Sequence, residues 1–199
     1  MILFMDFETS GLPDFNQRAR HESQPHIVQL AAILTDDSGD VLESHNCIVK
    51  PDGWTIPKEA SDLHGITDEI AQIGLPEKIV ASLLFEMVKK STLIVAHNIT
   101  FDKFIARIAL RRHELFTDTE DAWWKALPTF CTMRSMTDIC KLPGKFAGRF
   151  KWPSLQESHL HAFGKPFDGA HNAMADVLAC KDIYFWLNNP NKQNPTPNP

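Results

Sequence analysis

Two carboxylates stand two residues apart near the start of the chain, in the segment LFMDFETSG at residues 3–11. Residues 2–8 are β-compatible and mostly apolar, and a turn signal follows them, which predicts a strand. Residues two apart in a strand point to the same face, so Asp6 and Glu8 share one side. Two desolvated carboxylates repel each other, and a hard cation such as Mg²⁺ or Mn²⁺ would compensate them. The alternative is that Asp6 begins a turn and Glu8 is exposed.

A third acid follows in the segment VAHNITFD at residues 95–102. The apolar residues 92–96 predict a short buried strand, and residues 101–113 predict a helix whose first turn holds Asp102. An acid in this place lies at the end of a core strand, where the ligands of α/β sheets gather. The helix dipole also favours acids in a first turn, which is the structural alternative.

The segment HNAMAD at residues 171–176 adds a histidine and a fourth acid. On one regular helix His171 and Asp176 would lie about 140° apart, so they cannot both point into one site. The pattern makes sense if His171 lies in the loop before the last helix, predicted over residues 173–187, and Asp176 lies in the first turns of that helix. A lone histidine before a helix is otherwise an ordinary loop residue.

The rest of the pattern predicts the elements that position these groups. Two further strands, at residues 26–35 and 41–50, are close enough in sequence to pair antiparallel. Pro76 is expected to open a helix to residue 90, and residues 154–163 form a helix with the signature of a capping box. Strands that come first as an antiparallel group and then alternate with helices indicate an α/β domain with a mixed sheet. The residues expected on the apolar faces of the helices over residues 76–90 and 101–113 are Ile79, Leu83, Met87, Phe104, Ile105, Ile108 and Ala109.

Three segments are less regular. Residues 114–128 read as an acidic insertion that carries Trp123 and Trp124, and residues 129–133 are either a strand or a strand-to-helix junction. Residues 188–199 contain four prolines and no large apolar anchor, which predicts a disordered tail or linker.

Composition describes a soluble globular chain of 199 residues with a net charge of −5, long enough for one sizeable core. Its four cysteines form no CxxC pair, so a reducing cytoplasmic setting is expected and no zinc site is indicated. The first apolar run meets Asp6 too early for a signal peptide or a membrane span.

Positive charge is local. Residues 103–112 and 139–156 each hold four basic residues and no acid, a pattern that suits a polyanion, although solvated faces are the simpler interpretation of either run. In the second run Phe146, Phe150 and Trp152 alternate with cations. Such interleaving is typical of single-strand binding, but burial of these aromatic side chains in the core is the favoured interpretation.

Together and in this order, the motifs resemble the DEDDh branch of the DnaQ-like 3′–5′ exonucleases. DFETSGL, AHNITFD and HNAMAD correspond to the three family motifs, LHGITDE at residues 63–69 resembles a family loop, and the similarity covers residues 1–187. The resemblance implies one exonuclease domain with a ribonuclease H-like fold, a mixed five-stranded sheet flanked by helices. Where many relatives carry an aspartate-threonine pair, this chain has Cys131-Thr132.

The resemblance also implies roles. Asp6, Glu8 and Asp176 would bind one Mg²⁺ or Mn²⁺ ion, Asp6 would bridge to a second, and Asp102 would reach that ion largely through water. His171 would take the proton of the attacking water, and the product would be a nucleoside 5′-monophosphate. The substrate would be a single-stranded or frayed 3′ end of DNA or RNA, with a DNA polymerase subunit as a further candidate partner. The residues that would contact the substrate are Phe7, Thr9, Leu12, His64, Asn98 and Phe101.

Other functions stay open on sequence grounds. A catalytically silent nucleic-acid-binding or polymerase-associated subunit would keep the fold, but all five catalytic positions are filled here. An aspartyl phosphatase would need Asp-x-Asp rather than Asp6-x-Glu8. An RNA-trimming exoribonuclease would share every motif, so proofreading, repair and RNA processing are not separated.

Overall fold

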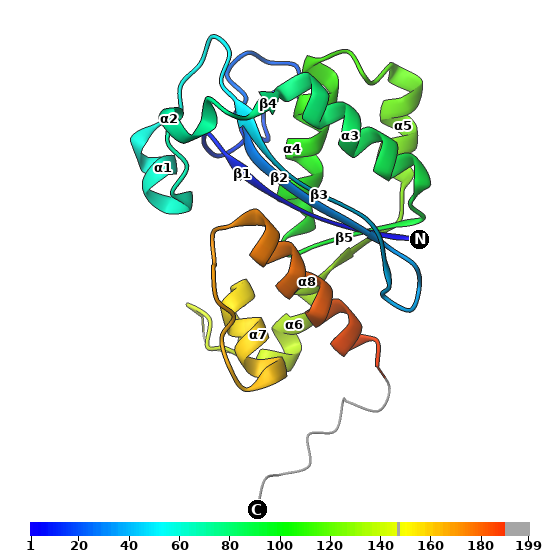
Figure 1. Cartoon of the computed structure of the whole chain (residues 1–199). Coiled ribbons are helices and arrows are strands. Elements are labelled where there is room, and N and C mark those ends of the chain that lie inside the picture. Colours follow the sequence, from blue (N-terminus) through cyan, green and yellow to red (C-terminus); the bar gives the residue numbers. More distant parts are fainter. Residues whose placement is uncertain (147, 190–199) are drawn as a thin grey trace, which may run out of the picture.

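A computed structural model describes residues 1–146 and 148–189. It contains one mixed sheet with helices on both faces (Figure 1). The strand order is β4-β3-β2-β1-β5-β6, in which β1 pairs antiparallel with β2 and parallel with β5. The strands are β1 (Ile2–Thr9), β2 (Ile27–Thr35), β3 (Val41–Lys50), β4 (Leu75–Pro76), β5 (Leu93–Ala96) and β6 (Thr129–Cys131).

The sheet therefore has one strand more than the five expected, because the two-residue β4 adds to the edge of β3. The helices are α1 (Lys58–His64), α2 (Asp68–Ala71), α3 (Glu77–Lys90), α4 (Ile99–Arg112), α5 (Asp118–Ala126), α6 (Thr132–Cys140), α7 (Leu155–Phe163) and α8 (Ala173–Leu187). None of the described helices is long and apolar enough to cross a membrane.

The two faces of β1 are both buried, which explains its nearly continuous apolar sequence. Leu3, Met5 and Phe7 belong to the main core, which α3 and α4 cover, whereas Ile2 and Phe4 pack with residues of α8. Figure 1 shows α3, α4 and α5 on one side of the sheet and α6, α7 and α8 on the other. By its alternation β1 therefore directs Asp6 and Glu8 toward the α8 side.

Most predicted elements form with small shifts, and the capping box before α7 is present between Ser154 and Glu157. Residues 129–133 are a strand-to-helix junction, β6 followed directly by α6, and α6 itself was not expected. The face predicted for α3 is wrong in part: Ile79 is exposed and Met87 is buried, together with Val80 and Leu84. Residues 190–199, most of the predicted tail, lie outside the described part of the chain.

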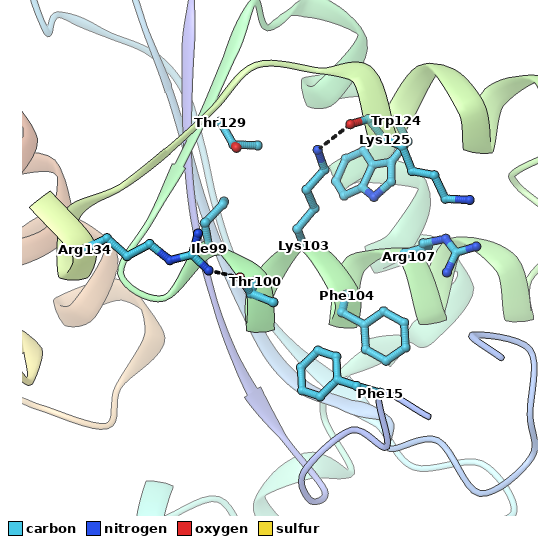
Figure 2. A pocket seen from close by; sticks show the side chains of 10 residues that line it. All are labelled: Phe15, Ile99, Thr100, Lys103, Phe104, Arg107, Trp124, Lys125, Thr129 and Arg134. Carbon is cyan, nitrogen blue, oxygen red and sulfur yellow. Dashed lines mark hydrogen bonds between the residues drawn. The ribbon is translucent and has the colours of Figure 1, made fainter. Parts of the chain in front are cut away.

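The segment taken as an insertion contributes to the core. It folds as α5, whose Trp124 is buried against Phe116, with ring centroids 5.7 Å apart. The basic run of α4 is not simply a solvated face, because three of its arginines form salt bridges. Its Lys103 donates to the backbone carbonyl oxygen of Lys125 at 3.4 Å (Figure 2). It also donates to that of Leu127 at 3.3 Å.

The second basic run contradicts the favoured interpretation of buried aromatic side chains. Phe146 is 72% exposed and Trp152 is 64% exposed. The chain folds back so that the Gly144 N–H donates to the Arg149 carbonyl at 2.9 Å, and a Cβ at Gly144 would meet that oxygen at 2.5 Å. The chain reversal therefore needs glycine there and leaves the neighbouring aromatic side chains outside the core.

Candidate metal centre and substrate pocket

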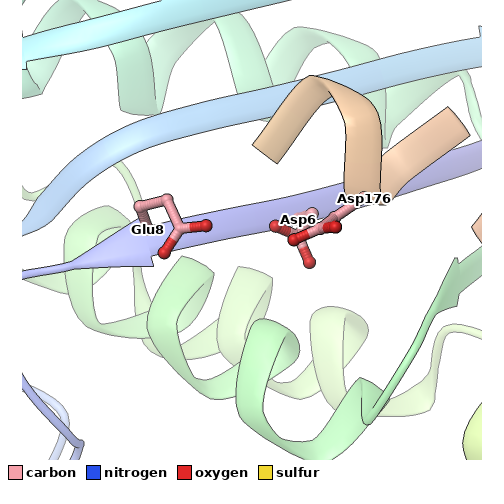
Figure 3. Close-up of side chains that lie close together, drawn as sticks. All are labelled: Asp6, Glu8 and Asp176. Atoms are coloured by element: carbon pink, nitrogen blue, oxygen red, sulfur yellow. The ribbon is translucent and has the colours of Figure 1, made fainter. Parts of the chain in front are cut away.

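Three acids from two elements converge at the end of β1. Asp6 and Glu8 project from one face of the strand, and Asp176 comes from the first turn of α8 (Figure 3). Each offers a carboxylate oxygen such that all three oxygens lie within 4.8 Å of one another. This juxtaposition joins residues 170 positions apart in the sequence, and it matches the predicted set except for Asp102.

Asp102 approaches from the other side of the sheet. The parallel strand β5 ends at Ala96, close to where Val95 pairs with Phe4, so α4 begins beside the following residues of β1. Asp102 lies in the first turn of α4, is 2% exposed, and accepts a hydrogen bond from the backbone N–H of Phe7. It stands outside the tight group of three but close enough for its charge to raise the pKa of Asp6.

Gln29 fixes the start of α8, and nothing in the sequence analysis singled it out. Its Oε1 accepts the Ala173 N–H at 3.3 Å. In the antiparallel pair of β1 and β2, Gln29 is the partner of Glu8. Asn172 caps the same helix through its side-chain oxygen, which accepts the Met174 N–H at 3.1 Å. The signal was present in retrospect, since Gln29 is the polar residue inside an otherwise apolar run of β2.

The four acids destabilise one another's ionised forms. Burial, followed by the charges of Asp102, Asp176 and Glu8, raises the pKa of Asp6 well above its ordinary value. Burial and Asp176 raise the pKa of Glu8 to about 8. Burial raises the pKa of Asp176 to about 6, although the backbone N–H of His171 opposes this shift. Burial also raises the pKa of Asp102.

A divalent cation fits this arrangement. Within residues 1–146 and 148–189, no lysine or arginine forms a salt bridge with any of the four acids, so their repulsion has no protein counter-ion. Clustered carboxylate oxygens are the donors that Mg²⁺, Mn²⁺ and Ca²⁺ prefer. The site is therefore built for a bound cation rather than for free carboxylates.

His171 lies in the loop before α8, as predicted. It is exposed and adopts a left-handed backbone conformation with φ of 66°. Its backbone N–H donates to Asp176 Oδ2 at 3.1 Å, which ties the histidine to one of the clustered acids. The loop thus holds the imidazole beside the carboxylates without burying it.

A pocket of about 370 Å³ adjoins Glu8 and brings together three of the predicted substrate residues, Thr9, Leu12 and His64. His64 Nδ1 accepts the Ile66 N–H at 3.1 Å, so the neutral ring carries its proton on Nε2. That Nε2 is buried beside the Thr9 backbone, and burial lowers the pKa of His64 while the Thr9 backbone opposes this shift. The two groups do not meet in hydrogen-bond geometry, so in the described part of the chain Nε2 has no hydrogen-bond partner. The pocket therefore presents an unused hydrogen-bond donor.

The other three predicted substrate residues lie apart from this pocket. The side chain of Phe7 is 5% exposed in the main core, so it is not placed to touch a substrate, and this expectation is corrected. Asn98 is exposed at the start of α4, with φ of 76°, a conformation that asparagine tolerates. Phe101 is half-buried against the main core.

The unusual Cys131-Thr132 pair is part of the packing behind the site. The Thr132 hydroxyl is buried and bonds His97 Nδ1 at 2.9 Å, while His97 Nε2 donates to the Pro153 carbonyl at 3.1 Å. Burial lowers the pKa of His97 to about 4, so this ring is neutral and structural. His97 thus joins the end of β5 to α6 and to the segment before α7.

Comparisons with known proteins agree with this geometry. An exonuclease family model, RNase_T, matches residues 3–184. The uncharacterized exonuclease CP81 of Escherichia phage 186 is 32% identical over 181 residues, which cover 87% of this chain and 81% of the phage protein.

Solved structures of exonuclease I share the fold. One is described as suggesting how processivity is achieved, with a TM-score of 0.73, 24% identity, and coverage of 96% of this chain and 41% of that chain. A zinc-bound complex of E. coli exonuclease I with single-stranded DNA has a TM-score of 0.69 at 25% identity, over 92% of this chain and 39% of that one. A complex of E. coli exonuclease I with a dT13 oligonucleotide matches with a TM-score of 0.72 at 24% identity, over 96% and 41%. The chain thus spans about two fifths of the length of exonuclease I.

Proposed function

The chain belongs to the DnaQ-like family of 3′–5′ exonucleases, and from this premise we propose that it removes nucleoside 5′-monophosphates from the 3′ ends of single-stranded DNA. The observation that carries the proposal is the meeting of carboxylate oxygens of Asp6, Glu8 and Asp176 within 4.8 Å, where no lysine or arginine of the described residues forms a salt bridge with them. Members of the family depend on divalent metal ions. We propose two Mg²⁺ or Mn²⁺ ions here, held by these three acids together with Asp102.

Bound divalent ions would stabilise the charge that develops on the phosphodiester and lower the pKa of the attacking water. The chain's own residues do the rest. Asp6, Glu8 and Asp176 would hold the ions, because β1 and the first turn of α8 bring their carboxylates together without a substrate. His171, exposed and tied through its backbone to Asp176, takes the proton of the attacking water.

The pocket beside Glu8 would receive the terminal nucleotide. Leu12 is 87% exposed on its rim and offers an apolar surface for a base. The buried Nε2–H of His64 would donate to an oxygen of the terminal sugar, since an unmet buried donor gains most from such a partner. Asn98 and Phe101 remain candidate contacts at the start of α4.

The choice of DNA is supported by the solved complexes of exonuclease I with dA16 and dT13 oligonucleotides, which concern that protein. An RNA-trimming activity would use the same residues, and a polymerase partner stays a prediction. We propose residues 1–187 as the catalytic domain, because α8 ends at Leu187 and the family model reaches residue 184.

The test is a strand-shortening assay. A 5′-labelled single strand of DNA and its RNA counterpart are incubated with the chain in Mg²⁺, with and without chelator. We expect a ladder that shortens from the 3′ end of the DNA, that chelator abolishes, and that Asp6→Asn abolishes in Mg²⁺. Binding without shortening would instead favour a catalytically silent subunit, and faster shortening of RNA would overturn the DNA assignment.

A further inference from the structure

A second pocket lies on the outer face of α4, away from the catalytic acids. It measures about 390 Å³ and is lined from α4, α5, α6 and the loop after β1 (Figure 2). Lys103 and Phe104 face it from the turn of α4 that follows Asp102. It shares no lining residue with the pocket beside Glu8.

Positive charge dominates this outer pocket. Lys103, Arg107, Lys125 and Arg134 line it, and no acid does. Arg107 and Lys125 share the single carboxylate of Asp121, with Arg107 Nη2 at 2.9 Å from Asp121 Oδ2 and Lys125 Nζ also at 2.9 Å from it. These three groups carry a net charge of about +1, which leaves the remaining two cations as the main source of attraction.

The two remaining cations have neutral partners. Lys103 Nζ donates to two backbone carbonyls and lies 5.5 Å from the ring centroid of Trp124. Arg134 donates to the Thr100 hydroxyl at 3.0 Å. In the part of the chain that the structure describes, neither forms a salt bridge with an acid. Both are therefore available to a phosphate, whose charge-assisted hydrogen bonds are strong.

An aromatic surface stands next to these cations. Phe15 is 56% exposed, and its ring stacks on that of Phe104 with centroids 4.9 Å apart and planes 23° apart. The loop that carries Phe15 is braced by Gln24, whose side chain bonds both the N–H and the carbonyl of Asp14, at 3.1 and 2.8 Å. Phe15 is thus held in place with one face toward solvent.

We infer that this outer pocket binds a nucleoside phosphate unit, with the base stacked on Phe15 and the phosphate on Lys103 and Arg134. The unit would be either a nucleotide of the strand whose 3′ end is being processed or a free nucleoside monophosphate. Exposed aromatic side chains beside cations are the usual way to bind single-stranded nucleic acid without reading its sequence. The inference rests on the proposed function for the nature of the strand, but the binding itself needs no catalysis.

Equilibrium binding in chelator, where no strand is cut, tests the inference. The probes are 5′-fluorescein-labelled dT8 and free dTMP, each measured over a series of salt concentrations. The variants are Arg134→Gln and Phe15→Ala, both at surface positions, and Lys78→Gln serves as the matched control because Lys78 is an exposed cation that lines a different pocket. Melting curves confirm that each variant is folded.

The dependence of dT8 affinity on salt concentration should distinguish the ionic contact of Arg134 from the stacking contact of Phe15. We expect Arg134→Gln to weaken dT8 binding and to reduce the slope of log K against log salt by about 1. Phe15→Ala should weaken dT8 binding by about five-fold or more with an unchanged slope. Lys78→Gln should change the dissociation constant of dT8 by no more than about two-fold and leave the salt slope unchanged, as expected for a surface charge that makes no contact.

The arms distinguish the two sources of the ligand. Loss of both dT8 and dTMP binding in the two variants would assign the pocket to a free nucleotide as well, whereas loss of dT8 binding alone would assign it to the strand. Unchanged binding of both probes, or an equal loss in Lys78→Gln, would overturn the inference. If the wild type shortens DNA in Mg²⁺ and both variants bind dT8 and dTMP as the wild type does, only the inference about the outer pocket fails. If the variants lose binding but the wild type shortens no strand, only the proposed function fails.

Discussion

At the scale of single residues, His171 occupies a position that its backbone makes selective. Its φ of 66° lies in the left-handed region, which few residues other than glycine, asparagine, aspartate and histidine adopt readily. The variant His171→Asn should therefore keep the loop and lose the base. We expect turnover on a 5′-labelled single strand to fall by about 10²–10⁴-fold, while Mn²⁺ binding, measured by calorimetry, stays at the wild-type level.

The outcome for His171→Asn is informative in both directions. Activity near that of the wild type would mean that another group accepts the proton. Loss of Mn²⁺ binding would mean that the imidazole itself supports the metal centre, because the backbone N–H that reaches Asp176 is retained in the variant.

The clustered acids predict an unusual dependence of stability on pH. In the absence of cations the folded chain raises the pKa of Glu8 to about 8, above the value of about 4.3 for an exposed glutamate. The folded state then holds more protons than the unfolded state, so the contribution of Glu8 is most favourable below about pH 4 and is lost as pH rises to about 8. We expect the melting temperature in chelator, taken relative to Glu8→Gln, to fall between pH 5 and pH 8.

Groups outside the four acids titrate alike in both proteins and cancel in that difference. Besides burial, the charge of Glu8 raises the pKa values of Asp6 and Asp102, and the loss of this effect in the variant changes the difference in the same direction. A difference that stays level or rises over this interval would show that Glu8 is not held in a repulsive site.

The sequence pattern predicted where the clustered acids lie, but it did not predict the burial and hydrogen bonds of the residues around them. Asp6 and Glu8 follow from the two-residue period of a strand, and Asp176 follows from the start of a helix. The burial of Phe7 follows from the same period, yet it became visible only once α4 was seen to cover that face of β1. The Ile66 N–H donates to Nδ1 of His64, which leaves Nε2 as the ring nitrogen that carries the proton. The spacing of residues in the sequence does not predict which of the two ring nitrogens accepts this bond.

At the scale of elements, a buried carboxylate joins three segments of the fold. Glu77, at the start of α3, accepts hydrogen bonds from Arg112 and His113 at the end of α4 and from His26 and the Ile27 N–H at the start of β2, all between 2.9 and 3.1 Å. Burial alone would raise its pKa, but these partners outweigh burial and hold the pKa of Glu77 below its usual range.

Removing this carboxylate should cost much of the chain's stability. Glu77→Ala leaves the buried Ile27 N–H and the partly buried Arg112 and His113 side chains without this acceptor, and we expect the free energy of unfolding in urea to fall by about 3 kcal/mol. The matched control is Glu86→Ala on the same helix, because Glu86 pairs with Lys89 at the surface and should contribute no more than about 1 kcal/mol. Equal losses in the two variants would contradict the assignment.

Helices and strands were predicted where apolar residues recur with a simple period. They were missed where tertiary contacts determine the start of the element. The helix α6 begins directly after β6, and its start depends on the buried contact of Thr132 with His97 rather than on a local signal. The aromatic side chains near Gly144 were expected inside, because their composition is that of a core. Their exposure is set by a chain reversal that only glycine permits.

At the scale of the whole molecule, the fold brings the last residues of the interior strand β1 together with the first turns of α4 and α8. A mixed sheet could be expected from an antiparallel group of strands followed by alternating helices, and the family resemblance supplied the ribonuclease H-like fold. The strand order itself comes from the structure. The additional strand β4 could not be foreseen, because two residues carry no period. The outer pocket is lined by residues of segments that are distant in the sequence, so no single stretch of sequence predicts it.

We propose that Asp6, Glu8 and Asp176 form a repulsive cluster that a divalent cation completes. The most direct measurement is the melting temperature of the wild type and of Asp6→Asn with and without millimolar MgCl₂, at ionic strength matched with NaCl. Mg²⁺ should raise the melting temperature of the wild type by several degrees and leave that of Asp6→Asn unchanged. An absent shift in the wild type, or the same shift in both proteins, would contradict the claim.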